Sequence, residues 1–132
     1  MTVYIAGAMT GIPFFNFPAF DAAAARFRLC FGYAVINPAD MDRAIGFDAM
    51  TLPANHDWYT FPPCLSFADC VTRDIEGVRR CDAIYMLEGW TSSKGARAEF
   101  ALAEWLGKKI WYENETLPVE EPPVQLPNIL AT

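Results

Sequence analysis

Short apolar runs rich in β-branched and aromatic residues alternate along this chain with longer segments of helical period. The runs occupy residues 3–6, 33–36, 83–87 and 109–112, and the segments between them predict helices that end near residues 31, 80 and 106. Strands that alternate with helices are joined by right-handed crossovers and form a mostly parallel sheet. We therefore predict an α/β fold in which helices cover both faces of the sheet.

Residues that favour helix ends support these boundaries. We expect Asn16 to cap the first helix, with Pro18 in its first turn, and Gly32 to end it. The later helices are expected over about residues 66–80 and 93–106, and Gly107 follows the second of them.

The length of 132 residues predicts a single domain over residues 1–132, and the 53% hydrophobic content is ample for a packed core. Residues 38–65 show little periodicity and contain Pro53, Pro62 and Pro63, so we expect a long loop there. A loop of this length in a compact domain is usually a lid or a binding segment. From about residue 113 prolines recur without an apolar period, which predicts an irregular tail.

The charge of the chain restricts its partners. A formal net charge of -6 disfavours nucleic-acid polymers, because phosphate backbones are bound by clusters of lysine and arginine. It does not disfavour a small nucleotide, which backbone N–H groups at a helix end can hold.

Cysteine and histidine content predicts neither a metal site nor another cofactor. The four cysteines form no CxxC pair, and His56 is the only histidine. We find no secretory signal and place Cys70 and Cys81 on buried faces, so we expect reduced thiols and a cytoplasmic protein. No apolar run reaches the roughly 18 residues of a membrane span, so we expect no membrane partner.

Two carboxylates interrupt apolar helix faces. At about 100° per residue, the neighbours of Glu99 on the helical wheel are apolar or small, as are those of Asp74. The two sets are Gly95, Ala96, Leu102, Ala103 and Leu106 for Glu99, and Phe67, Cys70, Val71, Gly77 and Val78 for Asp74. A buried carboxylate needs a partner, a shifted pKa or access to a cleft.

Two interpretations of these acids remain. In the first, both acids are structural groups satisfied by Arg73, Arg97 or a backbone amide. In the second, both belong to a site at the carboxyl ends of the strands, where parallel sheets bind ligands. Two acids together near that edge favour the site. Paired carboxylates are typical of chemistry at a glycosidic bond.

The approach to the last helix, residues 90–95, favours anion binding. Ser92, Ser93 and Gly95 place hydroxyl and N–H donors at the positive end of a helix. The alternative is that Ser93 simply caps the helix. The segment is not a P-loop, because the GxxxxGK[ST] pattern is absent.

Four stretches in order resemble the core of a known enzyme superfamily. They are Tyr4-Ile5-Ala6-Gly7, Asp74-Ile75-Glu76, Cys81-Asp82-Ala83-Ile84 and Ser93-Lys94-Gly95-Ala96-Arg97-Ala98-Glu99. Over about residues 2–112 the chain resembles the nucleoside 2-deoxyribosyltransferase superfamily, above all its compact phage and prophage members. The resemblance implies a flavodoxin-like (Rossmann-type) three-layer sandwich with a mostly parallel sheet of four or five strands.

The resemblance also implies roles for individual residues. Glu99 looks like the nucleophile that forms a covalent glycosyl-enzyme, Asp74 like the acid that protonates or orients the base, and Tyr4 like the hydroxyl that positions the nucleophile. Gly7 would allow close approach of the ligand to the backbone. The expected activity is cleavage or transfer at the N-glycosidic bond, by a hydrolase or a transferase.

Ser93 narrows the expected substrate. Members that use free nucleosides carry an aspartate six residues before the nucleophile, whereas nucleotide-hydrolysing members carry a serine that serves the 5′-phosphate. Ser93 therefore favours a nucleoside 5′-monophosphate. The chain departs from those hydrolases at Thr10, where they carry an arginine, and Lys94 or Arg97 would have to compensate.

Three further contacts are expected at the site. Phe14, Phe15 and Trp90 are candidates for stacking on the base, or are ordinary core aromatics. In the superfamily a neighbouring subunit completes the site with a polar side chain near its C-terminus, and Asn128 is the matching candidate. We therefore expect a homodimer or higher homo-oligomer.

Two alternatives to an enzyme remain open. One is a non-catalytic nucleotide-binding protein on the same fold, a sensor or sponge in which the carboxylates bind ribose or base. The other is a scaffold whose buried acids are structural.

Overall fold

The computed structural model describes residues 1–117 and contains one sheet of four parallel strands. The strands are β1 (Thr2–Ala6), β2 (Ala34–Ile36), β3 (Ala83–Met86) and β4 (Lys109–Tyr112), in the spatial order β2-β1-β3-β4. Tyr4 pairs with Ile36 of β2 on one side and with Ile84 of β3 on the other, so β1 lies between β2 and β3 in the sheet. The predicted α/β, flavodoxin-like architecture with a parallel sheet is confirmed.

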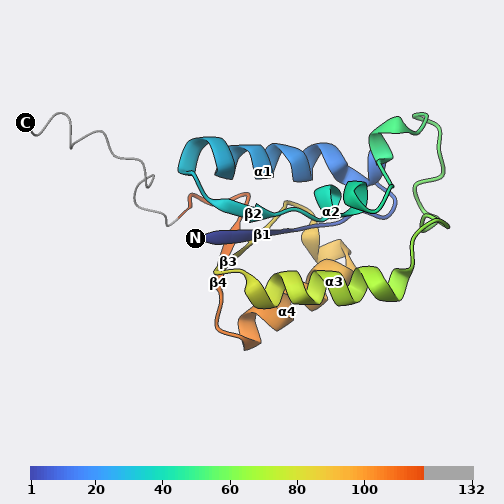
Figure 1. Cartoon of the computed structure of the whole chain (residues 1–132). Helices are drawn as coiled ribbons and strands as arrows, with labels where there is room; N and C mark the ends of the chain where they lie inside the picture. Colours follow the sequence, from blue (N-terminus) through green and yellow to red (C-terminus); the bar gives the residue numbers. More distant parts are fainter. Residues whose placement is uncertain (118–132) are drawn as a thin grey trace, which may run out of the picture.

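Helices cover the two faces of the sheet, as Figure 1 shows: α1 lies on one face, and α3 and α4 lie on the other. The helices are α1 (Phe17–Phe31), α2 (Pro38–Ala44), α3 (Phe67–Arg80) and α4 (Lys94–Trp105), with short 3-10 turns at Pro13–Asn16, Ala49–Thr51 and Trp90–Ser92. All four predicted strands and the three predicted helices are present within one residue of their expected ends. In the described residues no helix is long and apolar enough to cross a membrane.

Local chemistry explains the helix ends. Ser66 and Ser93 cap α3 and α4, each accepting a hydrogen bond from the backbone N–H three residues later. Gly32 ends α1 at a φ of 68°, which glycine adopts without steric cost.

Asn16 is the N-cap residue of α1, as predicted, but its side chain makes no capping hydrogen bond. The side chain instead donates to the carbonyl of Ala8 over 2.9 Å. Phe14, Phe15 and Asn16 all have positive φ, at 56°, 48° and 62°. Each such residue costs about 1 kcal/mol or more, and the buried Phe15 ring and the bond to Ala8 offset that cost.

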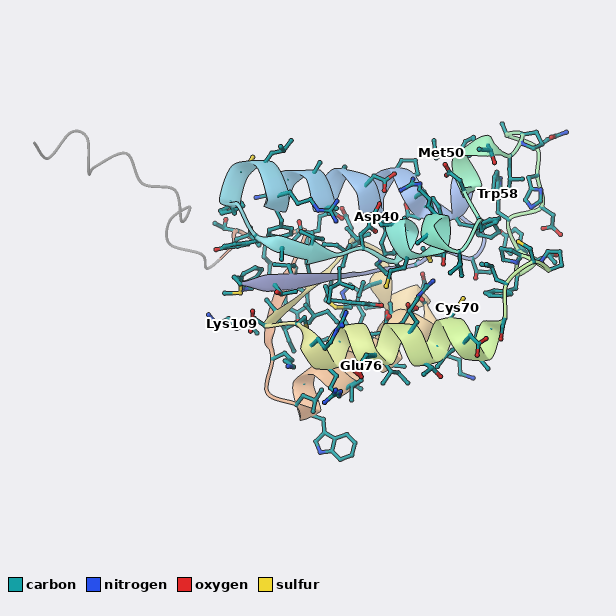
Figure 2. All side chains as sticks on the ribbon, viewed as in Figure 1. Asp40, Met50, Trp58, Cys70, Glu76 and Lys109 are labelled. Carbon is teal, nitrogen blue, oxygen red and sulfur yellow. The ribbon has the colours of Figure 1, made fainter. Side chains whose placement is uncertain are left out.

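The stretch expected to be an unstructured loop over residues 38–65 begins with helix α2 instead. Asn37 starts this helix, because its side chain accepts a hydrogen bond from the N–H of Ala39 and Pro38 supplies a first turn that needs no donor. The rest of the stretch packs against the turn before α1 through the Trp58 ring, 5.1 Å from those of Phe14 and Phe15. In Figure 2 Trp58 and Lys109 lie near opposite ends of the molecule.

Two apolar layers sandwich the sheet. Alternate residues of β1 point to opposite layers: Val3 and Ile5 pack in the layer beneath α1, while Tyr4 and Ala6 pack in the layer beneath α3 and α4. The second layer includes Ala96 and Ala103 of α4. Tyr4, a residue with a polar end, is therefore buried directly beneath the two helices that carry Asp74 and Glu99.

Candidate active site

Tyr4 and Glu99 meet across the interface between sheet and helix. The Tyr4 side chain is fully buried, and its hydroxyl donates a hydrogen bond to Oε2 of Glu99, which is half-buried on α4. Burial, together with the nearby charges of Glu99 and Asp74, holds the pKa of Tyr4 well above its usual value. Tyr4 therefore keeps its proton and holds one oxygen of Glu99, while no hydrogen bond within residues 1–117 holds the other.

Gly77 makes room for the Tyr4 ring. A Cβ atom at Gly77 would lie 2.8 Å from Cε2 of Tyr4 and 3.2 Å from Cγ2 of Ile36. Only glycine allows α3 to approach β1 and β2 this closely. The helical wheel placed Gly77 on the face of Asp74, but nothing in the sequence signalled this packing role.

Asp74 is held by a cation that also contacts a third carboxylate. Arg73 lies beside Asp74 on α3 and contacts its Oδ1 with both Nε and Nη2 at 3.0 Å. The same guanidinium donates to Oδ1 of Asp42 on α2 over 2.8 Å. Sequence reasoning named Arg73 as a partner for the acids and missed Asp42, which stands in the stretch expected to be loop.

Burial shifts the protonation of both central acids. Removal from water raises the pKa of Glu99 to about 8; the Tyr4 hydrogen bond and Arg73 oppose this rise, and the charge of Asp74 adds to it. Burial likewise raises the pKa of Asp74 to about 6, against the pull of Arg73. Between pH 6 and 8 this pair of acids therefore holds one proton and one negative charge.

The N-terminus of α4 carries the predicted anion-binding residues. Oγ of Ser93 accepts from the N–H of Ala96 over 3.1 Å, which is ordinary capping, and its own proton stays available for donation. A Cβ at Gly95 would meet only Oγ of Ser93, at 3.9 Å, so the surface there is open. Lys94 is exposed beside it, and Arg97 is also exposed, with its Nε 3.4 Å from the carbonyl of Ser93.

The proposed stacking aromatics pack against other rings. Trp90 stacks on Phe100 at 4.8 Å and lies 6.3 Å from Tyr112, and Phe14 lies 5.1 Å from Trp58. Both Trp90 and Phe14 are only partly buried. Each ring thus has a packing role whatever it does for a ligand.

The remaining predicted residues are spread over the first loop and the tail. A Cβ at Gly7 would lie 2.8 Å from Cδ1 of Leu87, so this glycine lets the loop pass close to the end of β3. Thr10 is exposed in the following turn. Asn128 lies outside the described residues.

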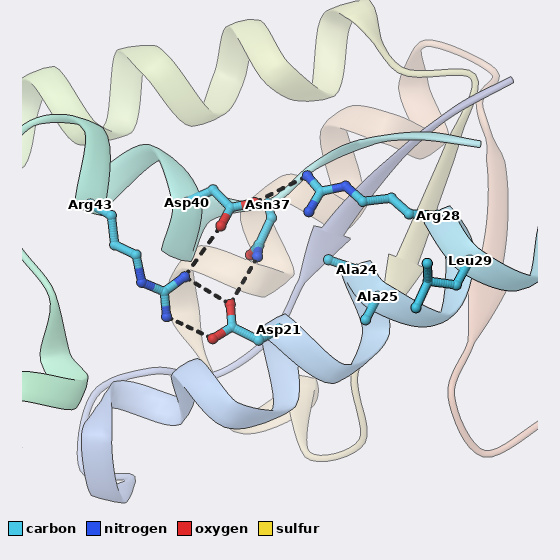
Figure 3. A pocket seen from close by; sticks show the side chains of 8 residues that line it. All are labelled: Asp21, Ala24, Ala25, Arg28, Leu29, Asn37, Asp40 and Arg43. Carbon is cyan, nitrogen blue, oxygen red and sulfur yellow. Dashed lines mark hydrogen bonds and ion pairs between the residues drawn. The ribbon is translucent and has the colours of Figure 1, made fainter. Parts of the chain in front are cut away.

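A groove of about 360 Å³ lies elsewhere, between α1 and α2 (Figure 3). Its charged side chains are paired with one another: Arg43 contacts Asp21 at 2.6 Å and Asp40 at 3.2 Å, and Arg28 contacts Asp40 at 3.0 Å. These pairs stabilise the junction of the two helices. The groove is separate from the cluster of Tyr4, Asp74 and Glu99.

A family model described as a domain of unknown function, DUF4406, matches residues 1–112. The match covers all four strands and every predicted site residue except Asn128. No curated protein matches the chain.

Proposed function

The chain belongs to the DUF4406 family, and we propose that it cleaves or transfers at the N-glycosidic bond of a nucleoside 5′-monophosphate. The observation that carries the proposal is the contact of the buried Tyr4 hydroxyl with Glu99 beside a second half-buried acid, Asp74. The resemblance to nucleoside 2-deoxyribosyltransferases supports the same chemistry.

The proposed reaction has two displacement steps. The free carboxylate oxygen of Glu99 attacks C1′ of the sugar, and the bond from C1′ to the base nitrogen breaks. The base leaves with the bond electrons and takes a proton from Asp74. Water, or a second base, then displaces Glu99 from C1′ and returns a proton to Asp74, so the configuration at C1′ is retained.

Electrostatics favour this transition state. Asp42, Asp74 and Glu99 bring three carboxylates together around the guanidinium of Arg73, so these four groups stay negative once one proton is bound. Positive charge develops on the sugar ring as the glycosidic bond breaks. A partly desolvated negative cluster stabilises that charge more than water does.

The proton shared by the two acids supplies both roles. Reaction needs Glu99 ionised and Asp74 protonated, which is the less populated arrangement of the singly protonated pair, because the higher pKa of Glu99 places the proton mainly on Glu99. We therefore expect base release to show a bell-shaped pH dependence with limbs near pH 6 and pH 8.

The phosphate of the substrate would bind at the N-terminus of α4. The backbone N–H groups of Lys94 and Gly95 precede the first helical hydrogen bond, which Arg97 donates to Ser93. They point outward with the positive end of the helix dipole, and the hydroxyl of Ser93 and the ammonium of Lys94 add to them.

The experiment is incubation with each ribo- and deoxyribonucleoside 5′-monophosphate, followed by chromatography for free base. We expect base release, its loss in Glu99→Gln and Glu99→Ala, and normal activity in Glu104→Gln, which alters an exposed acid on the same helix. With a substrate whose glycosyl-enzyme intermediate breaks down slowly, mass spectrometry of the protein should locate the sugar on Glu99. Addition of a second base separates transfer from hydrolysis, because transfer gives a nucleotide of the added base and hydrolysis gives the free sugar phosphate.

Two results would contradict the proposal. Full activity in both Glu99 variants would show that another group attacks the sugar. Tight nucleotide binding by calorimetry without base release would favour the non-catalytic sensor or sponge.

We also propose a cytoplasmic homo-oligomer. All four cysteines are free thiols, two of them exposed, as a reducing compartment allows. Trp105 at the end of α4 is 87% exposed, which suits a surface that another subunit covers.

A further inference from the structure

Arg73 bridges two helices that the chain builds from distant segments. Its Nη1 contacts Asp42 on α2, while Nε and Nη2 contact Asp74 on α3. Asp42 is 7% exposed and the Arg73 side chain is 22% exposed. An ion bridge this well shielded from water is far costlier to break than one on the surface.

The contacts between Arg73 and Asp74 all go to one oxygen. Both nitrogens meet Oδ1 at 3.0 Å, and within residues 1–117 no protein group donates to Oδ2. The bridge therefore fixes the rotation of the Asp74 carboxyl group and makes its two oxygens different. Oδ1 accepts from the guanidinium, and Oδ2 is left for a proton or a ligand.

We propose that Arg73, anchored by Asp42, is the positioning residue that holds Asp74 by Oδ1 and keeps Oδ2 for the proton delivered to the leaving base. The destination of that proton rests on the proposed function, whereas the bridge itself does not. Asp42 has a second effect, because it competes with Asp74 for the same guanidinium.

The charges around Asp74 give the bridge a distinctive signature. The groups that face it are Arg73 and Cys70 on its own helix, Tyr4 on β1, Glu99 on α4 and Asp42 on α2. Arg73 lowers the pKa of Asp74 and Asp42 raises it. Loss of Arg73 should therefore raise the pKa of Asp74, and loss of Asp42 should lower it.

The primary test is a carbon-13 NMR titration of the Asp74 carboxyl group in the free protein. We expect Arg73→Gln to move its midpoint up by about one pH unit or more and Asp42→Asn to move it down. Arg79→Gln is the matched control, since Arg79 forms an exposed pair with Glu76 on the same helix, and it should leave the midpoint unchanged. Shifts in the same direction in both bridge variants, or no shift in Arg73→Gln, would overturn the inference.

Activity provides the second readout. Arg73→Gln should lower kcat for base release about tenfold or more with a smaller change in KM, and should move the acidic limb of the pH profile upward. Arg73→Lys should recover part of kcat, because it restores the charge without the fork of donors. If the wild-type protein releases no base, the proposed function fails while the titration still decides the bridge. If Arg73→Gln does not fold, the titrations of Arg73→Lys and Asp42→Asn decide the question. Shifts of the Asp74 midpoint in opposite directions in these two variants support the bridge, and the absence of opposite shifts overturns it.

Discussion

At the scale of single residues, the chain places one carboxylate where folding disfavours its charge. Glu99 has a pKa of about 8 in the folded protein and an ordinary value of 4.5. Its protonated form is therefore favoured by the fold, and ionising it costs stability. A carboxylate with so strongly raised a pKa, in an otherwise apolar helix face, is typical of a functional site.

This residue makes the stability of the protein depend on pH in a definite direction. Because the folded pKa is raised, the contribution of Glu99 is fully present below about pH 4.5 and is lost as the pH rises through about 8. We expect the wild-type melting temperature to fall over this range and that of Glu99→Gln to fall less. The free energy of unfolding of the variant should match that of the wild type near pH 5 and should exceed it by about 1 to 3 kcal/mol at pH 8.

Thermal unfolding monitored by circular dichroism at a series of pH values measures this effect. Glu104→Gln serves as the control and should follow the wild type throughout. Parallel curves for Glu99→Gln and the wild type would mean that Glu99 ionises as freely in the fold as in water.

Gly77 gives a second prediction at this scale. Glycine to alanine inside a helix ordinarily adds up to about 1 kcal/mol of stability, and Gly95→Ala should show such a gain, since its Cβ would meet open space. Gly77→Ala should instead lose about 1 to 3 kcal/mol, because its Cβ would overlap the Tyr4 ring.

Urea denaturation of Gly77→Ala and Gly95→Ala compares the two glycines directly. The Gly77→Ala variant should also lose base release, since the Tyr4 hydroxyl would move away from Glu99. A stabilised Gly77→Ala protein would show that α3 shifts freely over the sheet.

At the scale of elements, α3 and α4 begin in the same way but only one is expected to bind substrate. Each helix has a serine N-cap whose oxygen accepts a backbone hydrogen bond, from Asp69 at 3.3 Å in α3 and from Ala96 at 3.1 Å in α4. The capping roles are thus equivalent, and a ligand role can be separated from them.

We expect Ser66→Ala and Ser93→Ala to cost about 1 kcal/mol of stability each. Only Ser93→Ala should raise KM for a nucleoside 5′-monophosphate, by about tenfold for one lost hydrogen bond to a charged group, with little change for the free nucleoside. Steady-state kinetics with matched nucleotide and nucleoside check this. Equal KM changes in the two variants would remove Ser93 from the phosphate site.

The elements also show where sequence reasoning succeeds. Helix α1 ends at Gly32 as expected, because a glycine after an apolar period stops a helix through purely local chemistry. The helix α2 was missed because it has only seven residues, too few for an apolar period to emerge.

At the scale of the whole molecule, both sides of the sheet leave large apolar side chains exposed. Phe67 and Val71, expected on the buried face of α3, are 65% and 38% exposed, and Trp105 on α4 is 87% exposed. The Phe67 ring packs edge-on against Phe61 of the preceding loop, at 5.3 Å. On the opposite side, Leu29 of α1 is 85% exposed.

We expect the protein to form a homodimer through the α3 and α4 side. Trp105→Glu should shift the sedimentation coefficient to that of a monomer, because a charge replaces the largest exposed apolar side chain there. Leu29→Glu, a comparable change on α1, should leave the dimer intact. Analytical ultracentrifugation at micromolar concentration is the measurement, and a monomeric wild type would contradict the expectation.

The sequence alone determined the order of strands and helices, the parallel sheet and the anomaly of Glu99 and Asp74 in apolar stripes. These features follow from local period and from residues adjacent along the chain, which are written in the sequence. Only the tertiary structure decided that Tyr4 meets Glu99, that Gly77 admits the Tyr4 ring and that Arg73 joins Asp74 to Asp42. Those contacts join residues up to 95 positions apart, and their geometry depends on how helices pack across the sheet, which no local pattern encodes.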